Sequence, residues 1–317
     1  MIGKTEKDME NIVVTGATSM LGIALIEAAL RDGEVRKIYA VVREDTQKAD
    51  RLPKDSRVEL VRCGIEDYKS LPDKIRNADV FYHFAWKLTG RQRNTDIHVQ
   101  ADNIGYALDA LSAAAKLGCN KFVGAGSQAE YGDTVSEKMS PDTPANPADA
   151  YGTAKFCAGK LAMQEAERLG MDCFWVRVLS VYGEYDTPTT MVSSTVAALM
   201  RGESPEFTPA GNIWDFLYSG DAGKAFYMIG KNARGNKIYC LGSGEGRLLR
   251  EYIETIGRVV NPDVDLRIGV LPYPNGAPRN ILADISGLSR DTGWSPETSF
   301  DEGIRRVLLF MREREKA

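Results

Sequence analysis

The chain has 317 residues, of which 43% are hydrophobic and 26% are charged, and its formal net charge is −4. This composition is that of a globular protein, and the acidic balance argues against a nucleic acid or an anionic membrane as a partner. Because residues 2–10 are mostly polar and no apolar run approaches the roughly 18 residues of a membrane span, we expect a cytoplasmic protein without a signal peptide.

Strand-like and helix-like segments alternate through residues 1–183. The candidate strands, which are rich in β-branched residues, span residues 11–15, 37–42, 58–62, 80–84, 121–125 and 173–178. The clearest helical patterns between them span residues 21–32, 97–117 and 151–169. This order of buried strands and helices predicts an α/β fold with a doubly wound parallel Rossmann sheet.

The alternation breaks after Gly183. We predict a helix at residues 191–201, a last strand at residues 237–241 that returns to the sheet, and helices at residues 248–260 and 300–315. The chain is therefore divided into two domains. Residues 1–183, joined by strand 237–241, form a dinucleotide-binding Rossmann domain, and residues 184–317 form mostly a smaller substrate-binding lobe.

The first strand runs into a glycine-containing turn and a helix, with the sequence TGATSMLG at residues 15–22. Its residues 16, 19 and 22 occupy the positions of a GxxGxxG turn, in which a serine replaces the middle glycine. Such a turn presents backbone N–H groups and a helix N-terminus to a pyrophosphate, and a tight structural turn is the alternative. The expected cofactor contacts in this segment are Gly16, Thr18, Ser19, Met20, Leu21 and Gly22.

Two polar side chains on a later helix indicate proton transfer. Tyr151 and Lys155 are four residues apart and share one helix face. A cation beside a phenol favours its ionisation, so Tyr151 can act as acid or base near neutral pH. Together with the glycine-containing turn, the pair predicts hydride transfer with a nicotinamide dinucleotide.

Arg43, at the end of the second strand, favours NADP(H) as the cofactor, although a solvated arginine is an equal alternative.

Six segments, taken in chain order, match the motifs of one family. TGATSMLG resembles TGxxGxxG, YHFA at residues 82–85 resembles HLAA, and SQAEYG at residues 127–132 resembles SSAxVYG. Tyr151 and Lys155 match YxxxK, RVLSVYG at residues 177–183 resembles RxxNVYG, and WDFLY at residues 214–218 resembles RDFIYV. Over nearly its whole length the chain is similar to extended short-chain dehydrogenases/reductases of the NAD-dependent epimerase/dehydratase family, which implies a nucleoside-diphosphate sugar as substrate.

The resemblance also implies roles for individual residues. Tyr151 would exchange a proton with the sugar hydroxyl or keto oxygen, and Ser127 would hydrogen-bond the same oxygen. Lys155 would bind the nicotinamide ribose and lower the pKa of the phenol. Asn103 would position the site through its backbone and a water. Further cofactor contacts would come from Phe84 and Ala85 after the fourth strand, and from Gly64 and Ile65, where the family usually has an acid.

Several departures from the family pattern bear on substrate and reaction. The asparagine of RxxNVYG is Ser180 and the arginine of RDFIYV is Trp214, so the identity of the substrate stays open. Dehydratases of the family carry an Asp-Glu pair directly after the site serine, where this chain has Gln128 and Ala129, which cannot transfer protons. Glu130 should point to the other face, so we predict no 4,6-dehydratase activity. The candidate substrate contacts are Trp86, Gln128, Ser180, Met191 and Trp214.

The helix at residues 97–117 carries apolar residues at helical spacing, which predict a core-facing stripe of Ala101, Ile104, Leu108, Leu111 and Ala115. In the family, this helix and the Tyr151 helix form a dimeric four-helix bundle. Close approach of these helices would be allowed by Ala154, Ala158 and Ala162. The resemblance therefore implies a homodimer.

Two reactions fit these residues equally. A nucleotide-sugar 4-epimerase would oxidise the C4 hydroxyl, let the 4-keto sugar rotate and return the hydride to its other face. A nucleotide-sugar 4-ketoreductase would use NADPH to make a deoxyhexose, which Arg43 and the SVYG segment favour. A non-catalytic cofactor sensor is disfavoured because such proteins usually lack the tyrosine and the lysine.

The sequence predicts no metal site, because its five cysteines are scattered without a CxxC pair and it has two histidines.

Overall fold

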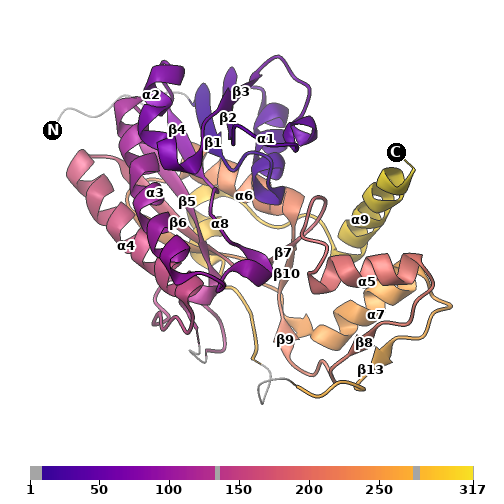
Figure 1. Ribbon diagram of the computed structural model, residues 1–317. Helices are drawn as coiled ribbons and strands as arrows, with labels where there is room; N and C mark the ends of the chain where they lie inside the picture. The colour runs from indigo at the N-terminus through magenta and orange to yellow at the C-terminus, as the bar shows by residue number, and fades with distance from the viewer. Residues whose placement is uncertain (1–8, 133–135, 274–278, 317) are drawn as a thin grey trace.

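A seven-stranded parallel sheet forms the centre of the structure, a computed structural model that describes residues 9–132, 136–273 and 279–316. The strand order is β11-β6-β5-β4-β1-β2-β3 (Figure 1). The strands are β1 (Asn11–Thr15), β2 (Lys37–Val42), β3 (Val58–Arg62), β4 (Val80–His83), β5 (Lys121–Ser127), β6 (Asp172–Val178) and β11 (Lys237–Leu241). The predicted α/β fold is confirmed. The order reverses between β1 and β4, which is where such sheets bind ligands at their carboxyl edge.

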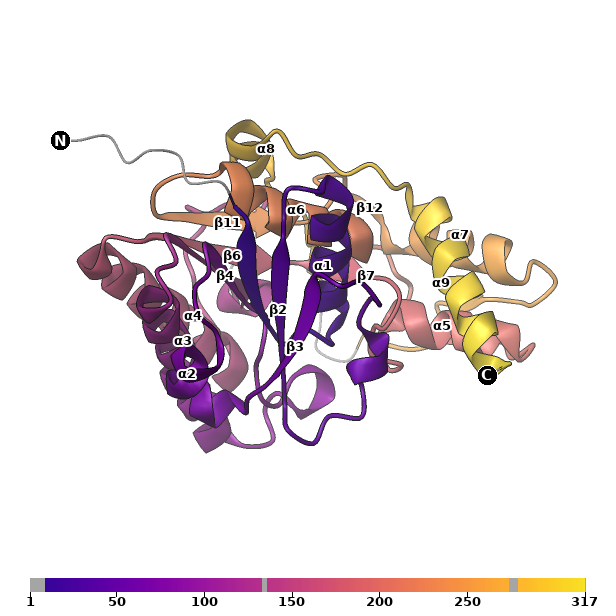
Figure 2. The ribbon, with the colours of Figure 1, turned by 90° about the horizontal axis from the view of Figure 1, so that it is seen from above.

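Helices cover both faces of the sheet (Figure 2). One face carries α2 (Leu71–Lys74), α3 (Ile97–Lys116) and α4 (Ala150–Leu169), over a core that includes Val13 and Phe122. The other face carries α1 (Met20–Asp32), α6 (Ser219–Asn232) and α8 (Ser286–Thr292), over a core that includes Ile12 and Val14. The side chains of neighbouring residues of β1 thus pack into the cores on opposite faces of the sheet, as the two-residue period of a strand requires.

Helix α6 is missing from the sequence prediction because its glycines lower the helix propensity. The structure explains two of them. A Cβ atom on Gly223 would overlap the backbone of Ala24 in α1, and one on Gly230 would overlap the Tyr82 hydroxyl of β4. The glycines therefore allow α6 to lie close to α1 and the sheet. Residues 219–241 and α8 accordingly pack with the sheet, inside the range assigned mostly to the second lobe.

The second lobe lies to one side of the sheet (Figure 1). It contains α5 (Met191–Met200), α7 (Leu249–Val260) and α9 (Phe300–Glu315), around a core that includes Tyr182, Tyr252 and Phe300. Its short strand pairs are β7 (Ser180–Tyr182) with β10 (Phe216–Tyr218), β8 (Glu206–Phe207) with β13 (Arg267–Ile268), and β9 (Ile213–Trp214) with β12 (Arg247–Leu248).

The predicted core stripe of α3 is wrong in its register. Of its five residues only Leu111 is buried, whereas Ala101 is exposed and the other three are half-buried. The buried positions are instead Gln100, Asn103, Ala107, Ala110, Leu111, Ala113 and Ala114. Small side chains let α3 approach the sheet closely, and the two amides bind the preceding loop. Ile104 and Leu108 are left half-buried at the edge of this contact.

The alanines of α4 face the interior of their own chain. Ala158 packs with Ala107 of α3 and with Trp175 of β6, and Ala154 and Ala162 are also buried. They bring α3 and α4 together within one chain. The large apolar side chains that α3 and α4 leave exposed are Ile97 and Leu161, with exposed fractions of 65% and 42%.

Candidate active site

The turn between β1 and α1 brings the backbone close to a neighbouring loop. Gly16 has a φ of +66°, and a Cβ atom on it would lie 2.8 Å from the backbone nitrogen of Ala85. Ser19 is the N-cap of α1, and its side chain accepts a hydrogen bond from the Gly22 N–H at 3.1 Å. The serine in place of the middle glycine therefore caps the helix. The first backbone N–H groups of α1 have no partner within the helix and remain available to an anion.

A cleft of about 500 Å³ opens at the carboxyl edge of the sheet, between the strands and the second lobe. It unites twelve of the predicted site residues: Gly16, Thr18, Ser19, Met20, Leu21, Arg43, Phe84, Ala85, Trp86, Ser127, Tyr151 and Lys155. The lining also includes residues that were not predicted, among them Lys48, Arg51, Val178, Leu179, Tyr185 and Asp186. No motif marks these residues, and the segment after β2 that carries Lys48 and Arg51 mixes acidic with basic residues.

The predicted catalytic pair, Tyr151 and Lys155, lies in the first two turns of α4. The Lys155 side chain is buried, and its Nζ donates a hydrogen bond to the Ala125 carbonyl at 2.7 Å. The same Nζ lies 3.7 Å from the centroid of the Trp86 ring and 5.9 Å from that of the Tyr151 ring. Burial lowers the pKa of Lys155 to about 7, and the nearby charge of Glu130 partly opposes this shift.

The pKa of Tyr151 differs from the expectation in its direction, because it is raised in this structure and Lys155 does not lower it. Burial raises the pKa of Tyr151, while a hydrogen bond with Ser127 and the charge of Arg93 act to lower it. Lys155 turns its ammonium towards Ala125 and Trp86. The cation that assists the phenol in this structure is therefore Arg93, whose guanidinium carbon lies 5.7 Å from the centroid of the Tyr151 ring.

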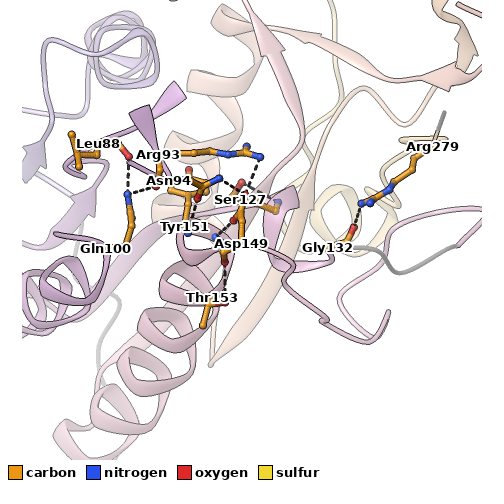
Figure 3. A network of polar contacts seen from close by, with 12 residues as sticks. Leu88, Arg93, Asn94, Gln100, Ser127, Gly132, Asp149, Tyr151, Thr153 and Arg279 are labelled. Atoms are coloured by element: carbon orange, nitrogen blue, oxygen red, sulfur yellow. Dashed lines mark hydrogen bonds and ion pairs between the residues drawn. The ribbon is translucent and has the colours of Figure 1, made fainter. Parts of the chain in front are cut away.

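Arg93 belongs to a polar network that joins the loop after β4 to the start of α4 (Figure 3). Its guanidinium pairs with Asp149 at 3.0 Å, and the Asn94 amide nitrogen donates to the same carboxylate at 3.1 Å. The side-chain oxygen of Asn94, Oδ1, accepts a hydrogen bond from the Tyr151 N–H at 3.4 Å. The side chain of Asp149, which is the N-cap of α4, accepts one from the Gly152 N–H at 2.7 Å. The network thus positions the helix turn that carries Tyr151.

Two buried amides of α3 hold the other end of this loop. The Asn103 side chain accepts from the Lys87 N–H at 2.9 Å and donates to the Lys87 carbonyl at 3.0 Å. The Gln100 side chain donates to the Leu88 carbonyl at 2.9 Å and accepts from the indole N–H of Trp86 at 2.8 Å. Asn103 does not line the cleft and acts on the loop through its side-chain amide.

Ser127 stands at the end of β5 and begins a short 3-10 turn, η4 (Gln128–Glu130). The Glu130 carboxylate folds back and accepts hydrogen bonds from the Ser127 N–H and the indole N–H of Trp175, both at 2.9 Å. Its second oxygen accepts from Arg177 Nε at 2.9 Å. Glu130 points away from the cleft, as expected, but the cause is this turn rather than the alternation of a strand.

Eight predicted site residues lie outside the lining of the cleft: Gly22, Gly64, Ile65, Asn103, Gln128, Ser180, Met191 and Trp214. Gly22 is buried in α1 and Ile65 in the core of the α3 face. Two of the substrate candidates, Gln128 and Trp214, each have a buried polar atom, Oε1 and Nε1, that finds no hydrogen-bond partner in the described ranges.

The lining fits a dinucleotide. Its charged groups include the cations Arg43, Lys48 and Arg51 and one carboxylate, Asp186, which suits the phosphates of such a ligand. Gly16 and the free N–H groups of α1 provide a backbone cradle. Within residues 9–132, 136–273 and 279–316, no cluster of His, Cys, Asp and Glu could hold a metal ion, and no helix is long and apolar enough to cross a membrane.

The fold and this cleft define an α/β enzyme of the nicotinamide-dinucleotide type. Residues 12–242 match the model of the NAD dependent epimerase/dehydratase family. The chain belongs to this family and is an enzyme of the extended short-chain dehydrogenase/reductase type.

Its relatives include more than one reaction type. A putative UDP-glucose 4-epimerase of Methanocaldococcus jannaschii is 25% identical over 312 residues, which cover 95% of this chain and 98% of that protein. A dTDP-glucose 4,6-dehydratase of Streptomyces antibioticus is 24% identical over 319 residues, covering 96% and 92%. The solved structure of the UDP-glucose 4-epimerase from Thermotoga maritima with UDP-glucose has the same fold, with a TM-score of 0.85 at 20% identity over 96% of this chain and 99% of that chain.

Proposed function

We propose that the protein is a nucleotide-sugar 4-epimerase, which oxidises the C4 hydroxyl of a nucleoside-diphosphate sugar and reduces the ketone again with the same NAD(P) molecule. The observation that carries the proposal is that Ser127, Tyr151 and Lys155 line one cleft together with Gly16 and the turn before α1. The similarity to UDP-glucose 4-epimerases supports the substrate class.

The residues of this chain divide the work of the reaction. A bound nicotinamide supplies the chemistry of taking a hydride from C4 and returning it. Tyr151 Oη accepts the proton of the C4 hydroxyl during oxidation and donates it during reduction. Ser127 Oγ would hold the same substrate oxygen, and Lys155, fixed by the Ala125 carbonyl, would bind the ribose next to the nicotinamide. Gly16 and the first N–H groups of α1 hold the pyrophosphate.

In the described part of the segment after Ser127, no acid and base are placed for elimination of water. Gln128 and Ala129 follow Ser127, and Glu130 is turned towards Trp175 and Arg177. We therefore maintain as part of the proposal that the protein is not a 4,6-dehydratase, although a dehydratase is among the similar proteins. Formation of a 4-keto-6-deoxy sugar from dTDP-glucose by the pure protein would contradict it.

A nucleotide-sugar 4-ketoreductase is the second candidate, favoured by one observation. Arg43 lies in the lining of the cleft at the end of β2, the place where an arginine suits the 2′-phosphate of NADPH. A preference for NADP(H) is thus part of the proposal. It favours the ketoreductase because a reductase needs a reductant that it binds and releases in each turnover.

A homodimer also belongs to the proposal. The outward side of α3 carries Ile97, Ala101, Ile104 and Leu108, all exposed or half-buried. Leu161 of the neighbouring α4 is exposed as well. An apolar stripe of this kind on two adjacent helices suits packing against a second copy.

The test is turnover without added cofactor. The purified protein is incubated with UDP-glucose, UDP-N-acetylglucosamine or dTDP-glucose, and the C4 epimers are followed by NMR. We expect one epimer pair to equilibrate, and Tyr151→Phe to slow this by about 10²–10⁴-fold while cofactor binding is kept. The ketoreductase would become the better proposal if no sugar gave an epimer and a 4-keto-6-deoxy sugar oxidised added NADPH.

A further inference from the structure

The ammonium of Lys155 is buried without a counter-charge. Among the residues that the structure describes, no carboxylate forms an ion pair with it, and its hydrogen-bond acceptor is the Ala125 carbonyl. The Glu130 carboxylate is engaged elsewhere, by the guanidinium of Arg177 and the indole of Trp175, both at 2.9 Å. Because an unpaired buried charge is costly, another group must stabilise the ammonium.

Aromatic rings surround the ammonium instead. Lys155 Nζ lies 3.7 Å from the centroid of the Trp86 ring, and 5.9 Å from the centroids of the Tyr151 and Trp175 rings. The rings of Trp86 and Tyr151 meet edge to face, with their centroids 6.3 Å apart. A cation is attracted to the face of an aromatic ring, most strongly to that of tryptophan and more so away from water. Trp86 is therefore the main partner of the ammonium.

Gln100 of α3 holds the Trp86 ring in this position. Its side-chain oxygen accepts a hydrogen bond from the Trp86 indole N–H at 2.8 Å. Its side-chain nitrogen donates to the carbonyls of Leu88 at 2.9 Å and Arg93 at 2.7 Å (Figure 3). Gln100 is itself only 1% exposed. A buried amide that is bound on both sides fixes the ring before a ligand arrives.

We propose that Trp86 is a positioning residue for Lys155, whose ring face replaces a carboxylate as the partner of the ammonium and holds it at the cleft. An uncharged ring attracts the ammonium without a salt bridge that a ligand would have to break. An ammonium has three N–H donors, and the bond to Ala125 leaves two of them for ribose hydroxyls. The inference rests on the proposed function in taking the ribose next to the nicotinamide as the ligand of Lys155.

The titratable groups around Lys155 do not supply this partner. Burial and the charge of Lys155 lower the pKa of His83 on β4 to about 3, so this ring is neutral. Burial raises the pKa of Tyr151 on α4, and Arg93 lies over the Tyr151 ring at 5.7 Å. Burial lowers the pKa of Lys155 to about 7, and the charge of Glu130 opposes this shift. The charge of Lys155 near neutral pH is therefore sensitive to the attraction of the Trp86 ring.

The experiment titrates Lys155 directly and keeps the shape of Trp86. Ring fluorines withdraw electrons from the indole face and weaken its attraction for a cation. Stop-codon suppression places tryptophans with one to four ring fluorines at position 86 of the full chain, which is labelled with ¹³C at the lysine ε-carbons and freed of bound nucleotide. The NMR signal of Lys155 is identified by its loss in Lys155→Met. We expect its titration midpoint to fall stepwise with fluorination, by about one pH unit in total.

Trp294 provides the matched control. It is buried in the core under α1 and α6, on the opposite face of the sheet, and its indole N–H donates to the Asp221 carbonyl at 3.0 Å. Within the described ranges, no lysine or arginine lies over its ring. The same fluorine series at Trp294 should leave the Lys155 midpoint unchanged to within about 0.2 pH units, because distant sites act independently.

The affinity for NAD⁺ then shows whether this charge serves the ligand. A fall of the midpoint by about one unit, from about 7, reduces the charged fraction of Lys155 about tenfold at pH 8 and about twofold at pH 6. We expect the dissociation constant of NAD⁺ for the variant with four fluorines to rise by these factors relative to the wild type.

Two results would overturn the inference. One is a Lys155 midpoint that stays constant across the Trp86 series. The other is a loss of NAD⁺ affinity that is equal at both pH values, which a ring with a merely structural role would give. Neither measurement uses a sugar or turnover, so failure of the epimerase assay is a separate result.

Discussion

The ion pair behind Ser127 allows a sharp test of how the site is held. The side chains of Glu130 and Arg177 are 1% and 3% exposed, and the carboxylate receives hydrogen bonds from the Ser127 N–H, Trp175 and Arg177. Glu130→Gln removes the charge but keeps the shape. It leaves the guanidinium buried without a counter-charge and turns an amide NH₂ group towards a donor. Removing one partner of such a pair costs about 3–5 kcal/mol.

The assay is thermal and urea unfolding of the cofactor-free protein. For a chain of 317 residues, that loss lowers the melting temperature by about 4–8 °C. Glu165→Gln is the control, since Glu165 pairs with Arg168 on the exposed side of α4, and we expect a change within about 0.5 kcal/mol. A double Glu130→Met, Arg177→Met variant should be more stable than Glu130→Gln, because it buries no unpaired charge. A melting temperature of Glu130→Gln equal to that of the wild type would refute the reasoning.

Three further predictions concern ionisation and assembly. The pKa of Lys155 falls from 10.5 to about 7 on burial, so between these values the unfolded chain binds more protons than the folded one. From pH 7 to pH 9 the stability of the wild type should therefore rise relative to Lys155→Met, by up to about 1.4 kcal/mol per pH unit, and a constant difference in urea unfolding would contradict this. Arg93→Met should raise the pKa of Tyr151 further and move the rising limb of the pH–rate profile to higher pH, whereas Arg93→Lys keeps it in place; a uniform loss of rate at every pH would indicate a merely structural role. Ile97→Glu combined with Leu161→Glu should convert the proposed dimer into a monomer by light scattering, and a double variant with the same mass as a dimeric wild type would contradict this interface.

The central sheet was predictable because its strands are short, apolar and separated by clear helix signals. The residues of β1 and β2 alternate between two cores, and both strands therefore carry continuous, mostly apolar runs. Helix α6 was not predictable, since the glycines that weaken its local signal are explained only by the nearness of α1 and Tyr82. Tertiary packing overrode local propensity at that place.

The candidate site divides in the same way. The turn residues and the Tyr151–Lys155 pair follow from spacing within one element, and the sequence shows such spacing directly. Arg93 and Arg51 reach the cleft from loops whose paths depend on contacts far along the chain, with Asp149 and Tyr185 respectively. Those contacts are long-range, so no local pattern marks either arginine. The face of α3 was misjudged because its buried positions are alanines and amides, which carry little apolar signal.

The surroundings of Ser127 bear most directly on which reaction the chain can perform. Elimination of water from a 4-keto sugar needs an acid for the leaving hydroxyl and a base for the neighbouring C–H. The carboxylate nearest in sequence to Ser127 is that of Glu130, and three donors fix it on the side away from the cleft. To serve as a base it would have to give up the ion pair with Arg177 inside the protein. In the proposed function, the network that fixes Ser127 therefore also keeps the Glu130 carboxylate away from the cleft, so that it cannot act as the base of a dehydration. The double variant Gln128→Asp, Ala129→Glu should supply the acid and base that dehydration needs.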